Sequence, residues 1–140
     1  MLLLDTNILS ELMRSAPDPA VTTWLDRQPA ESIWTTTITI FEIRFGLEIL
    51  PDSRRRDLLQ RLFERVLQEG IEGRILSFDP TAAQHAAGLA ATRQALGHPV
   101  DFRDTLIAGI ALARRATIVT RNTRHFADVN VPLIDPWMNS

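Results

Sequence analysis

Residues 1–12 read MLLLDTNILSEL, and they contain the first strand and the first helix that we predict. The three leucines form a continuous apolar run, which is typical of a strand buried on both faces of a parallel sheet. Asp5 ends that run, and the apolar residues after it recur at helical spacing. The stretch therefore predicts a buried strand that passes directly into a helix, with a carboxylate at the junction.

The same alternation of short apolar runs and helix-period segments continues along the chain. The expected strands are residues 2–4, 32–36, 74–78, 117–120 and 131–134. The expected helices are residues 6–14, 20–27, 40–50, 54–69, 80–96 and 102–115, and residues 121–127 form a connecting turn or helix. This order predicts a single α/β domain over residues 1–140, in which a parallel sheet of four or five strands has helices on both faces.

The composition excludes several functional classes. With 45% hydrophobic and 23% charged residues, the 140-residue chain is globular. The absence of cysteine excludes a thiol nucleophile and a thiolate metal site, and all 15 cationic side chains are arginine, which excludes lysine-dependent chemistry. A net charge of −2 gives no global basic field for nucleic acid. Without a long apolar run or a basic N-terminal leader, we expect no membrane contact and a cytoplasmic location.

Four oxygen-bearing side chains stand at predicted strand ends or helix starts. Asp5 follows the first strand, Glu42 and Asp104 fall in first helical turns, and Asn122 follows the fourth strand. In parallel sheets, ligands bind beyond the carboxyl ends of the strands, where the strand order reverses. Three carboxylates and an amide oxygen there would suit Mg²⁺ or Mn²⁺ better than zinc.

Each of these side chains also has a purely structural interpretation. Asp5 can be a helix N-cap, and Glu42 with Thr39 matches a capping box. Asp104 would be favoured by the helix dipole, and Asn122 is a common turn residue. Composition and spacing leave both interpretations open.

Four segments resemble the motifs of PIN-domain ribonucleases, and the resemblance is strongest to the toxin half of VapBC-type, FitAB-like toxin–antitoxin pairs. The segments follow in the family's order and cover essentially the whole chain. They are LLLDTNILSEL at 2–12, TITIFEIRFG at 37–46, DTLIAGIA at 104–111 and TRNTRHF at 120–126, with the family-like ending IDPW at 134–137.

The resemblance implies a metal-dependent catalytic site. Asp5, Glu42 and Asp104 match the three acidic positions that bind Mg²⁺, for which Mn²⁺ substitutes. Asn122 completes the catalytic set where many members have a fourth acid, and His125 stands where this subfamily often has aspartate. Thr6 and Thr120 are expected to support the site through their hydroxyls.

The implied activity is that of an endoribonuclease toxin that hydrolyses RNA to a 5′-phosphate and a 3′-hydroxyl. Arg121 and Arg124 are candidates for contacts with the RNA backbone. The substrate would be tRNA or another structured RNA. The implied partners are a cognate VapB- or FitA-like antitoxin, which lays a helix across an apolar groove, and a second copy of the chain in a homodimer.

Two rival folds are excluded, and one rival function stays open. A receiver domain needs a lysine on its last strand, and a haloacid-dehalogenase-type phosphatase needs Asp-x-Asp where this chain has Asp5-Thr6-Asn7. The open alternative is a non-catalytic PIN-like module that binds RNA or protein, which the Asn122 departure favours. If the three acids do share a site, their mutual repulsion should raise the pKa of at least one.

Overall fold

The computed structural model describes residues 1–98 and 100–138. In this part of the chain, five strands form one parallel sheet, as the sequence predicts, and the structure gives their order as β3-β2-β1-β4-β5. The strands are β1 (Leu2–Leu4), β2 (Ile33–Thr36), β3 (Ile75–Leu76), β4 (Thr117–Val119) and β5 (Leu133–Ile134). The central position of β1 explains why residues 2–4 are continuously apolar.

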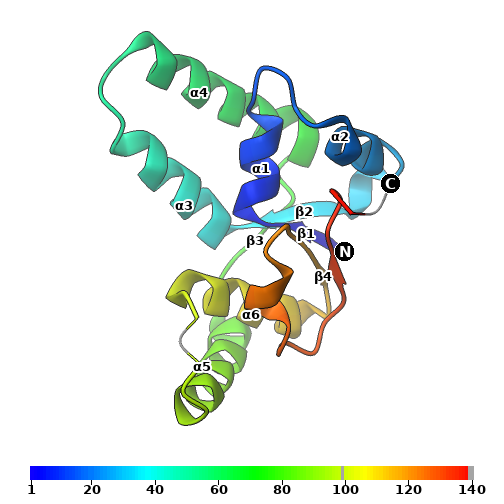
Figure 1. The fold of residues 1–140 in the computed structure, drawn as a ribbon, viewed down its shortest axis with the longest axis vertical. Coiled ribbons are helices and arrows are strands. Elements are labelled where there is room, and N and C mark those ends of the chain that lie inside the picture. Colours follow the sequence, from blue (N-terminus) through cyan, green and yellow to red (C-terminus); the bar gives the residue numbers. More distant parts are fainter. Residues whose placement is uncertain (99, 139–140) are drawn as a thin grey trace.

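Helices cover both faces of the sheet, which gives the domain three layers (Figure 1). One face carries α1 (Thr6–Leu12), α2 (Pro19–Asp26), α3 (Thr37–Glu48) and α4 (Arg54–Arg65). The other face carries α5 (Pro80–Ala95) and α6 (Phe102–Arg114). Shorter helical turns are η1 (Ala30–Ser32), η2 (Val66–Ile71) and η3 (Thr123–Phe126).

Each face of the sheet has its own apolar core, because successive side chains of a strand point to opposite faces. Leu4 packs with Ile8 and Phe63 on the side of α1 and α4. Leu3 packs with Ile107 and Phe126 on the side of α6 and η3. All six side chains are almost completely buried, so β1 and its neighbours are fixed between the two helical layers.

Helix α3 begins three residues earlier than the sequence predicts. Thr36 is its N-cap, and the Thr36 hydroxyl accepts a hydrogen bond from the backbone N–H of Thr39 at 3.1 Å. The predicted capping box of Thr39 and Glu42 is therefore wrong, and Glu42 lies in the second turn of α3 rather than the first. The β-branched residues of this segment obscured the boundary, because they favour strands in isolation.

The other predicted boundaries agree with the structure to within a few residues, except at the end of α4. There the helix continues as the π-helical turn η2 and ends where Glu72 and Gly73 adopt positive φ angles of 53° and 73°. Asp79 and Asp101 cap α5 and α6 by accepting backbone N–H bonds at 2.8 Å. The cap at Asp101 fixes the first turn of α6, which carries Asp104.

Across residues 1–98 and 100–138, no helix is both long enough and apolar enough to cross a membrane.

Candidate functional site

A cavity of about 560 Å³ opens beyond the carboxyl ends of β1 and β4. The strand order of the sheet reverses between these two strands, because the chain proceeds from β1 to β2 and β3 on one side and from β4 to β5 on the other. The cavity brings together most of the predicted site residues. Its lining includes Asp5, Thr6, Glu42, Asp104, Arg121 and Asn122. These residues come from α1, α3, α6 and the loop after β4, so the tertiary fold unites segments that are far apart in the sequence.

Asp5 serves both as a helix cap and as a wall of this cavity. Its Oδ1 accepts a hydrogen bond from the backbone N–H of Thr6 at 2.8 Å, which caps α1. Its Oδ2 accepts one from the hydroxyl of Thr120 at 2.8 Å. The structural and functional interpretations of this residue are thus compatible, and its carboxylate is held in one orientation.

Thr120 is fully buried and ties the loop after β4 to the start of α1. Besides donating to Asp5, its hydroxyl accepts hydrogen bonds from the Asn7 side chain at 3.2 Å and from the Asn122 N–H at 3.0 Å. The Asn7 side chain also accepts from the Arg121 N–H at 3.1 Å. This network places Arg121 and Asn122 at the cavity beside Asp5.

Glu42 presents an unpartnered oxygen to the same region. Its Oε1 atom is buried without a hydrogen-bond partner, and the neighbouring Thr6 hydroxyl is also buried without one. Burial, followed by the negative charge of Asp5, raises the pKa of Glu42 to about 7. The Glu42 carboxyl is therefore partly protonated near neutral pH.

Asp104 pairs with His125, which belongs to η3. The Oδ2 atom of Asp104 lies 2.8 Å from the Nδ1 atom of His125. Burial raises the pKa of Asp104, and the hydrogen bond from His125 opposes that rise. The pKa of Asp5 is raised as well, chiefly by burial. The predicted rise is confirmed, although desolvation contributes more to it than mutual repulsion does.

The donor set suits a hard cation, but the side chains do not form a finished coordination sphere. Within residues 1–98 and 100–138, no group of three His, Cys, Asp or Glu side chains is arranged to hold a metal ion. One oxygen of Asp104 is occupied by His125, and both oxygens of Asp5 accept hydrogen bonds. Among the described residues, the Oε1 atom of Glu42 has no hydrogen-bond partner that an ion would have to displace.

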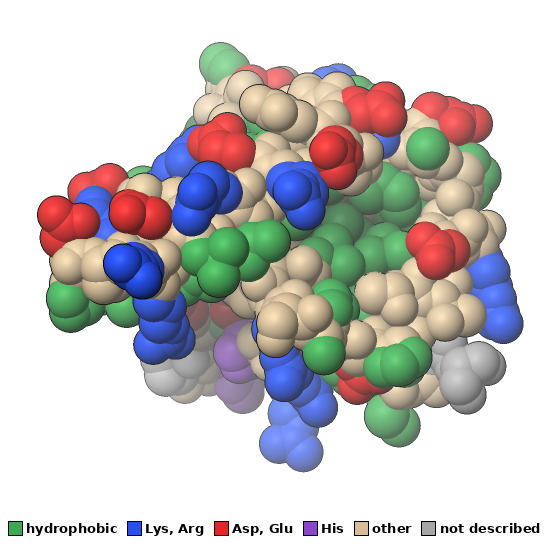
Figure 2. Space-filling model, turned by 90° about the horizontal axis from the view of Figure 1, so that it is seen from above, with side chains coloured by type: hydrophobic (Ala, Val, Ile, Leu, Met, Phe, Trp, Pro, Cys, Tyr) green, Lys and Arg blue, Asp and Glu red, His purple; other side chains and the backbone are tan. Residues whose placement is uncertain are grey.

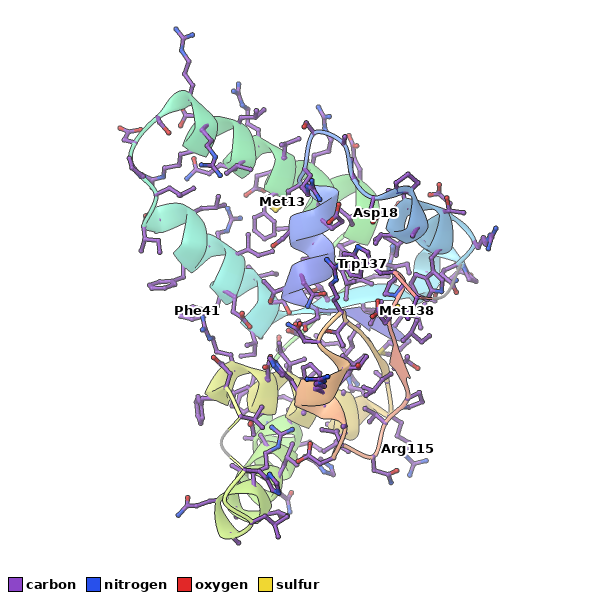
Figure 3. All side chains as sticks on the ribbon, viewed as in Figure 1. Met13, Asp18, Phe41, Arg115, Trp137 and Met138 are labelled. Atoms are coloured by element: carbon purple, nitrogen blue, oxygen red, sulfur yellow. The ribbon has the colours of Figure 1, made fainter. Side chains whose placement is uncertain are left out.

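Arg121 and Arg124, the two arginines expected to contact RNA, differ in their position relative to the cavity. The Arg121 guanidinium stacks over the Trp137 ring at 4.7 Å, and both line the cavity. Figure 3 shows Trp137 near α1, where it packs against the apolar core on that face. Arg124 is exposed and does not line this cavity.

The sequence did not single out every residue of the cavity. Asn7, Ser10, Glu11, Arg14 and Trp137 also line it. Glu11, in the last turn of α1, forms an ion pair at 3.2 Å with Arg14, which follows the helix. Their spacing of three residues was visible in the sequence, but only the tertiary fold shows that the end of α1 meets the cavity.

An apolar groove of about 580 Å³ adjoins the acidic cavity, and Thr6, Ser10, Arg14 and Glu42 line both. It lies among α1, α3 and α4. Its apolar lining is Met13, Ile43, Leu47, Leu50, Leu58, Leu59 and Leu62. Figure 2 shows hydrophobic side chains reaching the surface between acidic and basic ones on the face seen from above.

Comparisons with known proteins agree on one family. The model of the PIN domain matches residues 2–132. Plasmid stability protein StbB from Pseudomonas syringae is 39% identical over 98% of this chain and 99% of that protein. VapC ribonuclease Y4jK from Sinorhizobium fredii is 36% identical over 98% of each chain. The crystal structure of FitAcB from Neisseria gonorrhoeae superimposes with a TM-score of 0.87 at 32% identity and covers 99% of both chains.

Proposed function

The chain belongs to the PIN domain family, and from that premise we propose that it is a metal-dependent endoribonuclease toxin of the VapBC type. The observation that carries the proposal is the convergence of Asp5, Glu42 and Asp104 on one cavity at the carboxyl edge of the sheet. The proposal is supported by two relatives that match nearly the whole chain. One is named as a VapC ribonuclease, and the other is the FitAcB protein of the crystal structure. The activity would be exerted in the cytoplasm.

The cofactor we propose is Mg²⁺, with Mn²⁺ as a substitute, held by Asp5, Glu42 and Asp104. The unpartnered Glu42 oxygen and the all-oxygen donor set support this assignment. Binding would require the Glu42 side chain to rotate toward Asp5 and Asp104, because the three side chains are not yet arranged around a common point. A bound ion would make a bound water more acidic and stabilise negative charge on the phosphoryl oxygens.

The protein's own residues prepare the cavity for this reaction. The Thr6 backbone N–H and the Thr120 hydroxyl hold the Asp5 carboxylate in one orientation, so little reorganisation is needed when substrate enters. The Thr6 hydroxyl, which was expected from the sequence to support the site, makes no hydrogen bond to a described residue. In the metal-free protein burial raises the pKa of Glu42 to about 7, and the carboxyl would release its proton on binding the ion, because a ligating carboxylate is ionised. Water would attack phosphorus and break the bond to the 3′ oxygen, leaving a 5′-phosphate and a 3′-hydroxyl.

Structured RNA, such as tRNA, is the substrate class we propose. Arg121 is held at the cavity by Trp137 and by the Asn7 hydrogen bond, where its charge can meet a phosphate. Arg124 would contact the backbone farther from the cleaved bond. With a net charge of −2, the protein would rely on few phosphate contacts, so its affinity would depend on salt.

We further propose that a VapB- or FitA-like antitoxin neutralises this activity. The groove among α1, α3 and α4 is lined by seven large apolar side chains, which suit the apolar face of a helix. Because the groove shares four lining residues with the acidic cavity, a bound segment would continue directly over the carboxylates. A basic side chain of that segment would pair with them.

A homodimer is the assembly that we propose for the free protein. Phe41 and Phe45 lie one turn apart on α3, their rings stack at 6.1 Å, and they are 58% and 49% exposed. Figure 3 shows Phe41 pointing away from α1, on the outer side of its helix. Exposed aromatic pairs of this kind are typical of protein interfaces.

The rival function is a non-catalytic module that binds RNA or protein. It is favoured by Asn122 and by the His125 contact that occupies one oxygen of Asp104. Incubating the protein with tRNA in Mg²⁺, in Mn²⁺ and in EDTA separates the two. The proposed nuclease cleaves only with a metal and leaves 5′-phosphate ends. Binding without cleavage in all three conditions would establish the module instead.

A further inference from the structure

Arg93 is a buried cation outside the acidic cavity, and every nitrogen of its guanidinium donates a hydrogen bond. The side chain lies near the end of α5, and the residue is only 3% exposed. Nε and Nη2 donate to the two carboxylate oxygens of Asp128 at 2.8 and 2.7 Å. Nη1 donates to the Thr105 hydroxyl at 2.8 Å, and Nη2 also donates to the His125 carbonyl at 2.9 Å.

The three partners of Arg93, which are Thr105, Asp128 and the carbonyl of His125, lie next to the contact between the side chains of His125 and Asp104. Thr105 follows Asp104 in the first turns of α6, and Asp128 follows η3. The Arg93 side chain of α5 therefore bonds both α6 and η3, and these are the two elements whose Asp104 and His125 side chains meet at 2.8 Å. The His125–Asp104 bond is one direct polar link between η3 and α6. Arg93 supplies a second link, because it bonds the His125 carbonyl on one side and the Thr105 hydroxyl of α6 on the other, and no side-chain hydrogen bond from the described residues caps η3.

Packing of α5 against α6 does not explain a buried guanidinium. The two helices already meet through small side chains, and a Cβ at Gly109 would lie 2.7 Å from the Cβ of Ala86 and 2.6 Å from the Ala82 carbonyl. Burying a guanidinium against a half-exposed carboxylate costs desolvation energy, and an apolar side chain of similar volume would fill the space without that cost. What the guanidinium provides, and an apolar side chain does not, is directional bonding to η3.

We propose that Arg93 is a positioning residue of the acidic site: it fixes η3 against α6, so that the His125 ring holds the Asp104 carboxylate in one orientation. The role of Asp104 as a site acid rests on the proposed function. The Arg93 contacts themselves do not. Outer partners that orient a metal-ligating carboxylate typically contribute 10- to 100-fold to metal affinity or activity.

The test compares Arg93→Lys with Arg74→Lys in the full-length protein. Lysine keeps the charge but cannot make the bidentate bond. Arg74 is a matched control, because it is also largely buried and its Nε donates to a backbone carbonyl, that of Ile33 at 2.7 Å. Arg93→Lys should weaken Mn²⁺ binding, measured by calorimetry without RNA, about 10- to 100-fold and should lower kcat with little change in KM. Arg74→Lys should lower Tm only.

A double-mutant cycle tests whether Arg93 acts through His125. His125→Ala should weaken Mn²⁺ binding to a similar extent, and adding Arg93→Lys to it should cause little further loss. Additive losses would mean that Arg93 acts by another route and would overturn the proposal. So would an Arg93→Lys protein with reduced Tm but unchanged Mn²⁺ affinity and kcat.

A metal-free measurement separates failure of this inference from failure of the proposed function. In EDTA at pH 8, the ring-nitrogen NMR shifts of His125 report whether Nδ1 is hydrogen-bonded. Arg93→Lys and Asp104→Asn should move these shifts in the same direction, and Arg74→Lys should leave them unchanged. If Arg93→Lys does not fold, Asp128→Asn should produce a smaller shift in that direction. Unchanged His125 shifts in the folded variant overturn the positioning role, whether or not the protein cleaves RNA.

Discussion

The Thr120 hydroxyl donates a 2.8 Å hydrogen bond to Oδ2 of Asp5, joining residues 115 positions apart in the chain. This bond links the ends of the two strands between which the acidic cavity opens. Because Oδ1 of Asp5 simultaneously caps α1, one carboxylate stabilises the fold and borders the site. The predictions below separate these two contributions.

Asp5→Asn and Asp104→Asn should each abolish RNA cleavage while leaving the fold intact. Asparagine is also a good N-cap, so Asp5→Asn preserves the start of α1. The loss should exceed the roughly 100-fold typical of removing an outer partner of a metal ligand. Cleavage rates and circular dichroism check both points. Asp52→Asn, at an exposed position outside the cavity, serves as the control. Full activity in either site variant would show that other groups perform the reaction.

Stability of the metal-free protein should fall as pH rises from about 4.5 to 7. The Glu42 pKa is about 7 in the fold and near the ordinary value of 4.5 when unfolded. The unfolded chain therefore loses this proton first, and ionisation favours unfolding across that window. Glu42→Gln should reduce the effect and stabilise the protein at pH 8 by no more than about 3 kcal/mol, because the raised pKa values of Asp5 and Asp104 contribute the remainder. Thermal melts in EDTA measure it, with Glu31→Gln as the exposed control. Equal pH profiles for Glu42→Gln and the parent would contradict the assignment.

Millimolar Mn²⁺ should raise the melting temperature at pH 7.5. An ion that binds only the folded state adds about 2.7 kcal/mol at a hundredfold excess over its dissociation constant. For a domain of this size, that corresponds to roughly 5–10 °C. Asp104→Asn should erase the gain and should itself melt higher than the parent in EDTA, because a partly buried carboxylate is neutralised. Coincident parent melts in EDTA and Mn²⁺ would indicate that the acids act only as helix caps.

Arg121→Ala should weaken RNA binding and reduce the slope of log affinity against log salt by about one. Trp137→Leu should reproduce part of this loss, since the Trp137 ring supports the guanidinium at 4.7 Å. Filter binding of tRNA to Asp5→Asn protein, which cannot cleave it, provides the measurement. Arg27→Ala, an exposed arginine outside the cavity, should leave the slope unchanged. An unaltered slope in Arg121→Ala would place the phosphate contacts elsewhere.

Leu58→Asp should prevent antitoxin binding without reducing RNA cleavage. Leu58 is 51% exposed and lines the groove on α4, so a charge there meets the apolar face of a bound helix at little cost to the free protein. Co-purification with the cognate antitoxin and cleavage assays at saturating antitoxin test this. Leu96→Asp, exposed at the end of α5, is the control. A variant that remains fully inhibited would exclude the groove as the docking site.

Much of the fold could be predicted because its determinants are local. The apolar run of residues 2–4, the caps at Asp79 and Asp101 and the positive φ of Gly97 each act within a few residues. The start of α3 was misplaced because Thr36, Thr37 and Thr39 fit either a strand or a helix cap. Only the pairing of β2 with β1 and β3 decides where that strand ends.

The sequence indicated the cavity residues that stand at a strand end or a helix start, and it did not indicate several of the others. Asp5 and Asp104 stand at boundaries that the sequence displays. Trp137 and Arg93 do not, because their contacts are with partners distant in sequence, such as Arg121 and Asp128. An arginine in an alanine-rich helix suggests a solvated side chain. Nothing in the neighbouring sequence indicates that Arg93 will be buried and will bond Asp128, 35 residues later.

The position of β1 at the centre of the sheet has a consequence for how the protein is made. One edge of β1 pairs with β2, which is synthesised soon afterwards, but its other edge has no partner until residues 117–119 emerge from the ribosome. Until then Asp5 lacks the Thr120 hydroxyl, and Asp104 lacks His125. The acidic cavity can therefore form only after nearly all of the chain has been translated, so we expect the protein to acquire its site late in synthesis.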